Sequence, residues 1–399
     1  MKRIYFTVTN DLVYDQRMIR ICRSLAAGGY SVVLVGRRLP GSIPLREEPF
    51  LQKRLYCLFR RGKAFYIEFN LRLFIFLLFR KMDALCAIDL DTILPCLWVS
   101  RQKKIARIYD AHELFSEMKE VITRRAIKNF WTKVERYAVP QYASGYTVSR
   151  SIVEEFRKRY GVDYELIRNV PLLQDEPTPT PVPVPVLIPG PVLNPARAAL
   201  SSSSGDHSSS SGDHSSVPEK RFILYQGAVN EARGLESLIG AMRRVDVQLL
   251  ICGEGNKMEA CRRLTEQYGL TGKIIFRGLV GPDELRDITQ KAYIGINLVE
   301  RVGLNQYYSL ANKFFDYIHA GLPQLTMDFP EYRLVNDQYP VGLLISDTDE
   351  KKIVYALNNL LENDVLYRMF KENCQRARHE YNWQEEEKRL LRFYQKIFG

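Results

Sequence analysis

Short apolar runs alternate with amphipathic stretches along most of the chain. In the first half the runs predict strands near 3–8, 31–35, 84–88, 105–109 and 145–148, and 14–27 is typical of a helix that ends at Gly28 and Gly29. In the second half they predict strands near 221–226, 247–252, 273–276, 293–298, 323–326 and 341–345. Helical patterns between them cover 234–244, 257–268, 282–290, 312–320 and 349–362. Strands separated by helices indicate an α/β protein with two doubly wound parallel sheets.

The composition changes completely between the two halves. Alternating prolines occupy 177–185, and a repeated Ser-Ser-Ser-Ser-Gly-Asp-His unit follows in 201–216. Such segments favour extended or disordered chain. We therefore predict a Rossmann-like domain at 1–172, a linker at 173–220 and a second Rossmann-like domain at 221–382. An amphipathic helix is expected in the tail, 383–399.

Positive charge is concentrated in the first half of the 399-residue chain. The net charge is +11, and residues 1–170 carry 31 Lys and Arg against 17 Asp and Glu. Residues 51–81 hold eight basic residues and one glutamate. An anionic membrane surface or a phosphorylated substrate would each match this charge. Because no nucleic-acid-binding motif accompanies it, we expect no nucleic-acid partner.

An apolar run lies inside the basic region. Residues 73–79 are seven consecutive apolar residues, and Arg72, Arg80 and Lys81 flank them. The wider apolar stretch, 65–79, is shorter than the roughly 20 residues that span a bilayer. A core helix packed on the sheet and a membrane-docking amphipathic surface are both open interpretations.

The cysteines and the beginning of the sequence bear on location. Seven cysteines are scattered without a Cys-x-x-Cys spacing, which favours a reducing compartment and argues against structural zinc. Met1 is followed almost directly by a predicted strand, with no signal-peptide pattern. We expect a cytoplasmic protein, with attachment to the inner face of the cytoplasmic membrane left open.

The stretch 309–323 reads as one short helix with marked ends. Asn312 is expected to be its N-cap, Gly321 its left-handed end, and Pro323 prevents continuation. Lys313 and Asp316 then lie near its N-terminal end, where free amides and one cation suit a phosphate or diphosphate. The alternative is an ordinary capped helix with a solvated lysine.

Two further turns are predicted at the same edge of the second sheet. Gly227 follows the first strand of this half, and Arg233 comes just before a helix. Gly253 and Gly255 follow the next strand. Because the carboxyl ends of parallel strands share one edge, glycine amides, Arg233 and Lys313 are expected to meet there, as in a site for a nucleotide diphosphate.

These motifs resemble those of retaining glycosyltransferases of the GT-B type, in family 4 (glycosyl transferases group 1). The resemblance excludes the linker and is carried by 225–230, 233–234, 253–255, 276–278 and 312–323, and in the first half by 10–11, 15–17, 89–95 and 109–113. It implies two Rossmann-like domains that face each other across a cleft, with a C-terminal helix that crosses back onto the first domain.

The resemblance also implies roles for individual residues. Arg233 and Lys313 would neutralise the departing diphosphate, Asp316 would bind the donor ribose, and His112 would reach toward the donor sugar. The residues expected to bind the donor are Gly227, Gly253, Glu254, Gly255, Arg277, Gly278, Ser309, Asn312 and Asp316. Those expected on the acceptor side are Asn10, Asp11, Asp89, Asp91 and Glu113.

The implied activity is transfer of a sugar from a nucleotide-sugar to a cell-envelope glycan or lipid-linked acceptor, with retention and with no metal or other cofactor. Asp89 and Asp91 form an Asp-x-Asp string, which is too common to indicate a metal site. Two departures from the family pattern are Tyr308, at a position that is usually a carboxylate, and Ala228, near a usual arginine. They leave open a nucleotide-sugar epimerase of the same fold or a non-catalytic partner subunit. For His112, a structural role is the alternative.

Overall fold

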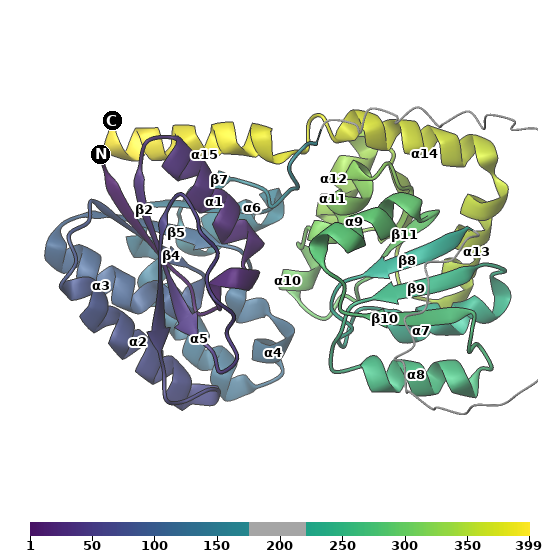
Figure 1. Cartoon of the computed structure of the whole chain (residues 1–399), viewed down its shortest axis with the longest axis horizontal. Coiled ribbons are helices and arrows are strands. Elements are labelled where there is room, and N and C mark those ends of the chain that lie inside the picture. Colours follow the sequence, from purple (N-terminus) through teal and green to yellow (C-terminus); the bar gives the residue numbers. More distant parts are fainter. Residues whose placement is uncertain (175–220) are drawn as a thin grey trace, which may run out of the picture. The chain divides into compact units, whose positions relative to one another are not determined.

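Two parallel β-sheets, each with helices packed against it, make up the described part of the chain (Figure 1). The computed structural model describes residues 1–174 and 221–399. All but the first two positions of the predicted linker, 173–220, lie outside the described residues. Every strand pairing within both sheets is parallel, which confirms the predicted α/β class.

The first sheet has seven strands in the order β3-β2-β1-β4-β5-β6-β7. Its central strand, β1, aligns Ile4 with Val32 on one side and with Ala84 on the other. The order reverses beside β1, and in such sheets ligands bind beyond the carboxyl ends of the strands near the reversal. The strands are β1 (Arg3–Thr7), β2 (Ser31–Arg38), β3 (Leu51–Tyr56), β4 (Ala84–Ile88), β5 (Ala106–Ala111), β6 (Ser144–Thr147) and β7 (Glu165–Leu166).

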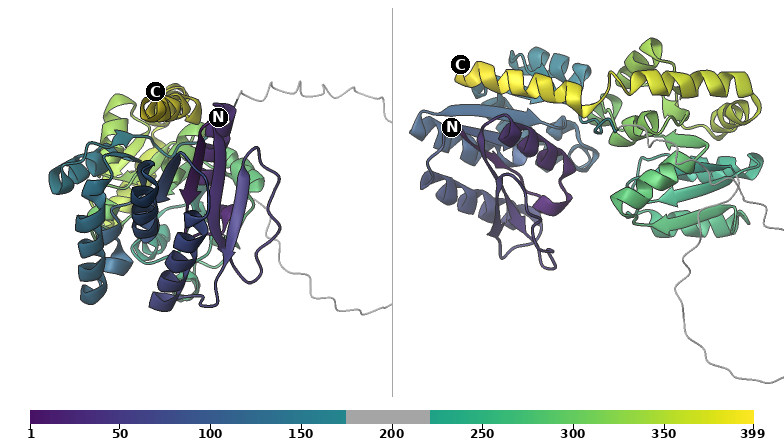
Figure 2. Two further views of the ribbon diagram at one scale, coloured as in Figure 1. Left: turned by 90° about the vertical axis from the view of Figure 1, so that its left-hand side faces the viewer. Right: turned by 45° about the horizontal axis from the view of Figure 1, so that its top comes forward.

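Helices cover both faces of the first sheet (Figure 2). One face packs against α2, α3, α5 and α6, and the other packs against α1 and α15. The helices of this half are α1 (Gln16–Ala27), α2 (Gly62–Leu78), α3 (Ile93–Lys103), α4 (Lys119–Ile122), α5 (Arg125–Ala138) and α6 (Arg150–Tyr160). Short 3-10 helices occur at Leu12–Tyr14, Leu90–Thr92, Phe115–Glu117 and Val139–Gln141, and in the second half at Met242–Arg244.

The second sheet has six strands in the order β10-β9-β8-β11-β12-β13. They are β8 (Phe222–Gln226), β9 (Gln248–Cys252), β10 (Ile274–Gly278), β11 (Ile294–Asn297), β12 (Gln324–Met327) and β13 (Gly342–Ile345). The helices are α7 (Leu235–Ala241), α8 (Met258–Gln267), α9 (Pro282–Lys291), α10 (Leu304–Tyr307), α11 (Asn312–His319), α12 (Pro330–Gln338), α13 (Glu350–Glu362), α14 (Asp364–Ala377) and α15 (Trp383–Phe398).

The last helix, α15, packs on the first half of the chain, beside α1 (Figure 2). Its first residue, Trp383, is buried, and the indole Nε1 donates a hydrogen bond of 2.9 Å to Ser24 Oγ on α1. Further along, Phe393 and Tyr394 join the core that contains Phe6 of β1. The crossover helix of the expected fold class is therefore present.

The hydrophobic pattern predicted all six strands of the second sheet but missed several other elements. The edge strand β3 was missed because its sequence, Leu51–Tyr56, is largely polar and half exposed. The two-residue strand β7 is too short to leave a pattern. The helices α10, α12 and α14 were also not predicted.

Candidate active site

Three glycine turns stack at the carboxyl edge of the second sheet. Gly227 follows β8 and Gly253 follows β9, while Gly278 ends β10. The Gly253 N–H donates to the Gly278 carbonyl at 2.7 Å, and all three residues have positive φ, which favours glycine. A Cβ on Gly253 would lie only 1.8 Å from the Gly227 carbonyl oxygen. The turns therefore fit together only without side chains.

The remaining residues predicted for these turns lie beside them. A Cβ on Gly255 would meet the Val229 carbonyl oxygen at 2.2 Å. Glu254 is exposed, and its Oε1 lies 3.2 Å from where a Cβ on Gly278 would stand. Arg277 forms an ion pair of 2.8 Å with Glu284 on α9. The structure thus brings the predicted glycines and Glu254 together at one edge.

The N-terminal end of α11 is directed to the same edge, but the predicted N-cap is wrong. Ala311 holds the cap position in extended conformation, and Asn312 is already the first helical residue. The cause is tertiary: the Tyr332 hydroxyl accepts the Ala311 N–H at 3.1 Å and fixes the preceding turn. Asn312 Oδ1 instead accepts from Asn169 Nδ2 at 2.8 Å. Because no side chain caps α11, first-turn amides remain available to an anion.

Lys313, in the first turn of α11, has an unusual environment. Its Nζ lies 3.9 Å from the centroid of the Tyr225 ring and is shielded from solvent. Within 1–174 and 221–399 this ammonium has no hydrogen-bond partner. A Cβ on Gly227 would stand 3.7 Å from it. Burial, with added repulsion from Arg233, lowers the pKa of Lys313 to about 7.

Asp316 lies one turn further along α11. Its Oδ2 accepts a hydrogen bond of 2.9 Å from Gln226 Nε2, at the end of β8. Burial raises the pKa of Asp316 to about 6, although the nearby positive charge of Arg20 opposes that shift. Arg20 belongs to α1 and donates to Asn169 Oδ1 at 2.5 Å. Gln226 and Arg20 are site residues that the sequence did not reveal; a polar residue ending a buried strand was the one available signal.

At the carboxyl edge of the first sheet, His112 lies between two carboxylates. Its Nε2 is 3.2 Å from Asp110 Oδ2 and its Nδ1 is 3.6 Å from Asp89 Oδ2. The His112 N–H also donates to Asp89 Oδ1 at 2.9 Å. Burial alone would lower the pKa of His112, but Asp110 and Asp89 outweigh it and raise the pKa to about 9. The ring is therefore an imidazolium at neutral pH.

Asp110, which contacts the His112 ring, is itself part of a buried ion pair. Asp110 forms a fully buried ion pair of 3.0 Å with Arg17 on α1. Despite burial, the charges of Arg17 and His112 hold the pKa of Asp110 below its ordinary value. Asp89 itself has a φ of 54°, a left-handed conformation that is uncommon outside glycine. These features fix the ring in one orientation.

The other predicted acceptor-side residues divide into two sets. The pKa of Asp89 is raised to about 7. Burial is the largest cause, and the nearby negative charges of Glu113 and Asp91 add to it. Burial likewise raises the pKa of Asp91 to about 6, and its Oδ2 accepts from Thr9 Oγ1 at 2.5 Å. These carboxylates form an acidic group around His112.

Asn10 and Asp11 are engaged within the fold. Asp11 is buried, with one oxygen 2.6 Å from Arg54 and the other bonded to Ser42. Asn10 is exposed and donates to Asp15 at 3.3 Å. This geometry gives Asp11 a structural task in the loop after β1.

The turn before α11 differs from what the resemblance implies. Ser309 Oγ donates to the Gln306 carbonyl at 2.7 Å. The Tyr308 side chain packs against the core of the first half, and its carbonyl accepts from Ser149 Oγ at 3.0 Å. The Ser309 hydroxyl is therefore already engaged within the turn.

Contacts from α10 reach the loop that follows His112. Asn305 Oδ1 accepts the Leu114 N–H at 2.9 Å. Nearby, Lys119 pairs with Glu231 at 2.8 Å. Asn305 could not be predicted from local pattern, because α10 was not predicted and Leu114, the partner of Asn305, is 191 residues away.

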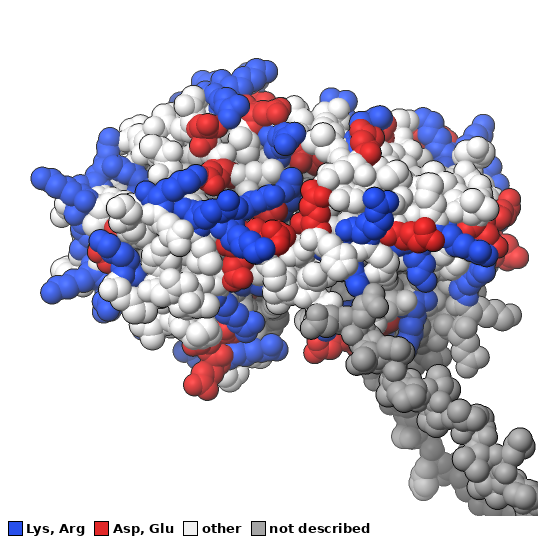
Figure 3. Space-filling model, turned by 90° about the horizontal axis from the view of Figure 1, so that it is seen from above, with Lys and Arg blue, Asp and Glu red and all other residues white. Residues whose placement is uncertain are grey.

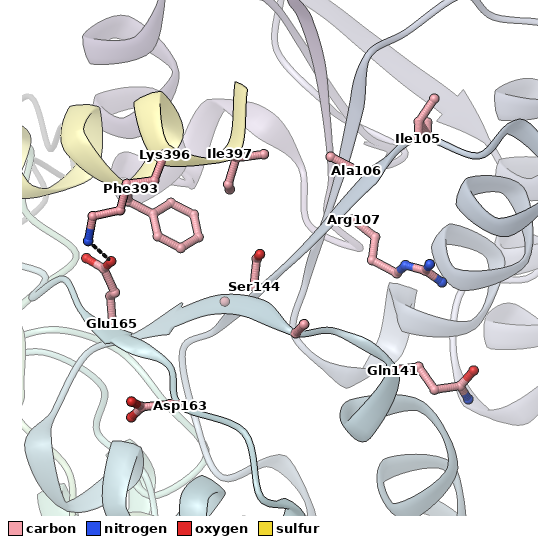
Figure 4. A pocket seen from close by; sticks show the side chains of 12 residues that line it. Ile105, Ala106, Arg107, Gln141, Ser144, Asp163, Glu165, Phe393, Lys396 and Ile397 are labelled. Atoms are coloured by element: carbon pink, nitrogen blue, oxygen red, sulfur yellow. Dashed lines mark hydrogen bonds and ion pairs between the residues drawn. The ribbon is translucent and has the colours of Figure 1, made fainter. Parts of the chain in front are cut away.

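A pocket of about 550 Å³ lies elsewhere, at the opposite end of the first sheet (Figure 4). It opens beside Ala106 and Ser144, the first residues of β5 and β6, and the ion pair between Glu165 and Lys396 borders it.

No group of three or more His, Cys, Asp or Glu in the described ranges could hold a metal ion.

Comparison with known proteins identifies the class. Residues 208–377, which are less than half of the chain, match the family model of Glycosyl transferases group 1. The whole chain has the GT-B fold. It superposes on sucrose-phosphate synthase from Thermosynechococcus elongatus with a TM-score of 0.72 at 15% identity, covering 100% of this chain and 99% of that one.

Two further matches are informative. Anabaena HepE in complex with UDP-glucose superposes with a TM-score of 0.73 at 9% identity, over 99% of this chain and 100% of that one. Phosphatidyl-myo-inositol mannosyltransferase from Mycolicibacterium smegmatis is 25% identical over 188 residues, which are 45% of this chain. That match spans about half of the relative, 46% of its length.

Proposed function

We propose that this protein is a retaining glycosyltransferase that moves a sugar from a nucleotide-sugar to a cell-envelope glycan or lipid-linked acceptor on the cytoplasmic side of the membrane. The group 1 domain and the GT-B fold support transferase chemistry. A structure of similar fold holds UDP-glucose, which supports a nucleotide-sugar donor. The mannosyltransferase relative supports an acceptor joined to lipid.

One observation carries the proposal. The Lys313 ammonium is buried without a hydrogen-bond partner in the described chain, close enough to Arg233 that the two charges repel. Such an arrangement is unfavourable in the empty protein, and a bound dianion would relieve it. The uncapped start of α11 and the glycine turns add amide donors at the same place. A diphosphate is the ligand that these groups fit.

The proposed reaction breaks the bond between the sugar C1 and the diphosphate oxygen, and the acceptor oxygen forms the new bond on the same face. The bonding electrons leave with the diphosphate, which takes up the acceptor hydroxyl proton. Arg233 and Lys313 stabilise the charge that develops on the leaving group, a task that needs no metal cofactor here. The reaction uses no side-chain nucleophile.

His112 would act on the sugar side of the site. Its imidazolium, fixed by Asp110 and Asp89, is a charged donor for a hydroxyl of the donor sugar. The acidic group of Asp89, Asp91 and Glu113 would accept hydrogen bonds from acceptor hydroxyls. In this proposal the Asp316 carboxylate binds the donor ribose, and Gln226 orients that carboxylate through its side-chain amide.

The test is a screen of nucleotide-sugars for thermal stabilisation, followed by donor hydrolysis and transfer assays. Arg233→Ala and Lys313→Ala should each lower turnover about 100-fold or more, since each removes a charge on the leaving group. Lys371→Ala, at an exposed position in the same half, is the matched control. Unchanged turnover in both site variants would refute the assignment.

Tyr308 favours one second candidate, a non-catalytic partner subunit. Because residue 308 is a tyrosine, this position supplies no carboxylate to the donor. The Tyr308 ring packs against the core of the first half. Binding of a nucleotide-sugar without hydrolysis or transfer would support that role, and measurable turnover would exclude it. Analysis of the sugar product without acceptor separates transfer from epimerisation.

A further inference from the structure

The helix α2 is apolar on two opposite faces, and one of them is uncovered. Every fourth residue from Phe65 to Leu77 is buried against the sheet. Two positions further along, about 200° around the helix, a second row faces solvent. This row, which we call the α2 stripe, consists of Ile67 (70% exposed), Leu71 (58%), Ile75 (49%) and Phe79 (81%), the last directly following the helix. The two interpretations left open by the sequence therefore apply to opposite sides of one helix.

The apolar surface continues beyond α2 on both sides. Trp98 on α3 is 47% exposed, and its ring meets Phe74 edge to face with the centroids 6.3 Å apart. At the other side, exposed Leu58 and Phe59 are held beside α2, because both of their N–H groups donate to the Glu68 carboxylate. An exposed patch of contiguous large apolar side chains marks an interaction surface.

Positive charge surrounds the stripe. Arg60, Arg61 and Lys63 precede it, and Arg80 and Lys81 follow it, all exposed and without an ion pair in the described residues. The one acidic residue of this region, Glu68, is neutralised by Arg72 at 2.8 Å and by two backbone amides. The rim is therefore cationic with no free carboxylate within 51–81.

We propose that the α2 stripe and its basic rim form a docking surface for an anionic lipid bilayer. Apolar side chains would enter the interface between headgroups and acyl chains, while the rim pairs with lipid phosphates. Within the described parts of the chain, no helix has the length and hydropathy to cross a membrane, and docking at the surface requires none. This docking surface is independent of the proposed reaction. Vesicle binding needs neither donor nor acceptor, so it can be tested even if the transferase activity is absent.

Charge alone does not single out this surface. Figure 3 shows Lys and Arg side chains across the first-half portion of another face, the one that carries α15. That face includes Lys388, Arg392 and Lys396. Among residues 1–174, only α2 combines bordering exposed basic residues with a row of large exposed apolar side chains spaced four apart. A bilayer needs both features for stable attachment.

The experiment is co-sedimentation of the full chain with vesicles of phosphatidylcholine, with and without phosphatidylglycerol. We expect binding to the anionic vesicles at low salt and release as salt is added. Leu71→Gln with Ile75→Gln should lower the bound-to-free ratio at least about tenfold. Leu279→Gln with Val365→Gln, two positions each 81% exposed in the second half, is the matched control and should change nothing.

Charge is tested in parallel. Arg60→Gln, Arg61→Gln and Lys63→Gln together should weaken binding about 100-fold at low salt, since each basic residue near an anionic surface contributes roughly fivefold. The control triple, Lys351→Gln, Arg368→Gln and Lys371→Gln, removes equal charge from exposed positions of the second half. A circular-dichroism melt of each variant shows that it is folded.

Trp98 on α3, beside the α2 stripe, supplies an independent readout in the wild-type protein. Its fluorescence should be quenched by vesicles with brominated acyl chains. Trp98→Phe should remove most of that response, because Trp383 is buried and the half-buried Trp131 packs among the rings of Tyr66, Phe115 and Phe130. Absence of wild-type binding at low salt would overturn the proposal. Undiminished vesicle binding by the Leu71→Gln and Ile75→Gln variant would also overturn it. So would a wild-type protein that binds no vesicles and is dimeric, with the same variant monomeric, because the α2 stripe would then be a dimer interface.

Discussion

The ammonium of Lys313 lies over the aromatic face of Tyr225, 3.9 Å from the ring centroid. This contact and the nearby charge of Asp316 compensate the buried cation among the described residues, where its Nζ forms no hydrogen bond. A ring face stabilises a desolvated ammonium less than a carboxylate would. The charge of Lys313 is consequently available to a ligand and easily lost by titration.

Donor affinity should therefore depend on pH through Lys313. With its pKa lowered to about 7 in the free protein, Lys313 must take up a proton when a diphosphate binds. Apparent affinity for a nucleotide-sugar should fall between pH 7 and 9, by up to about tenfold for each pH unit. Calorimetry in buffers of different ionisation enthalpy measures both the affinity and the proton uptake.

The control for this prediction is Lys313→Arg, whose guanidinium stays charged over the same interval. Its affinity should change by no more than about twofold from pH 7 to 9, which is the part that His112, with a pKa raised to about 9, adds through its own titration. Asp316, with a pKa raised to about 6, finishes its titration below this interval and does not interfere. Equal pH dependence in the wild type and in Lys313→Arg would contradict the role given to Lys313.

Substitutions of Tyr225 separate its ring from its hydroxyl. The hydroxyl donates a 2.7 Å hydrogen bond to the Ala228 carbonyl, so Tyr225→Phe should cost about 1 kcal/mol of unfolding free energy and keep donor affinity. Tyr225→Leu also removes the aromatic face, at a further cost of roughly 1–2 kcal/mol. It should weaken nucleotide-sugar binding at pH 8. Urea unfolding and calorimetry give both quantities, and equal affinities of the two variants would exclude the ring contact.

Local sequence pattern was sufficient for the second sheet, for five of the seven strands of the first sheet and for the edge where the glycine turns meet. Strands such as β8 and β9 are mostly apolar and each is followed directly by a glycine, and parallel topology then dictates that Gly227 and Gly253 meet. The polar edge strand β3 was missed because half exposure leaves no apolar run. It pairs in parallel with β2 and aligns Leu51 with Val33.

Contacts between distant residues could not be predicted in the same way. Arg17 and Asp110 are 93 positions apart, and nothing near either residue indicates that they pair. The same holds for Arg20, whose charge reaches Asp316 across nearly the whole chain. At Asn312 local preference gave the wrong result, because Tyr332 fixes the turn before α11 and moves the cap to Ala311.

The clamped imidazolium of His112 should stabilise the fold in a pH-dependent way. Because the folded-state pKa is raised to about 9 from an ordinary value near 6.5, the stabilisation is complete below pH 6.5 and is lost as pH rises through 9. It amounts to at most about 3 kcal/mol. Urea unfolding of the wild type and of His112→Gln at pH 6, 8 and 10 should show a difference that shrinks with pH.

A second histidine variant is the control for that series. His379→Gln changes an exposed residue in the second half and should leave the unfolding free energy within about 0.5 kcal/mol of wild type. A difference between wild type and His112→Gln that stays constant from pH 6 to 10 would show that the ring acts through packing rather than charge.

Two glycine substitutions test how tightly the donor edge is built. In Gly253→Ala the new Cβ would lie 1.8 Å from the Gly227 carbonyl oxygen at a φ of +151°, so the turns must separate. We expect a loss of about 3 kcal/mol or more and no thermal stabilisation by a nucleotide-sugar. Gly272→Ala has a φ of +87° but open space around the Cβ, and should cost only about 1 kcal/mol with ligand stabilisation retained. Equal urea midpoints for the two variants would show that positive φ, and not the close approach of the turns, requires glycine at this edge.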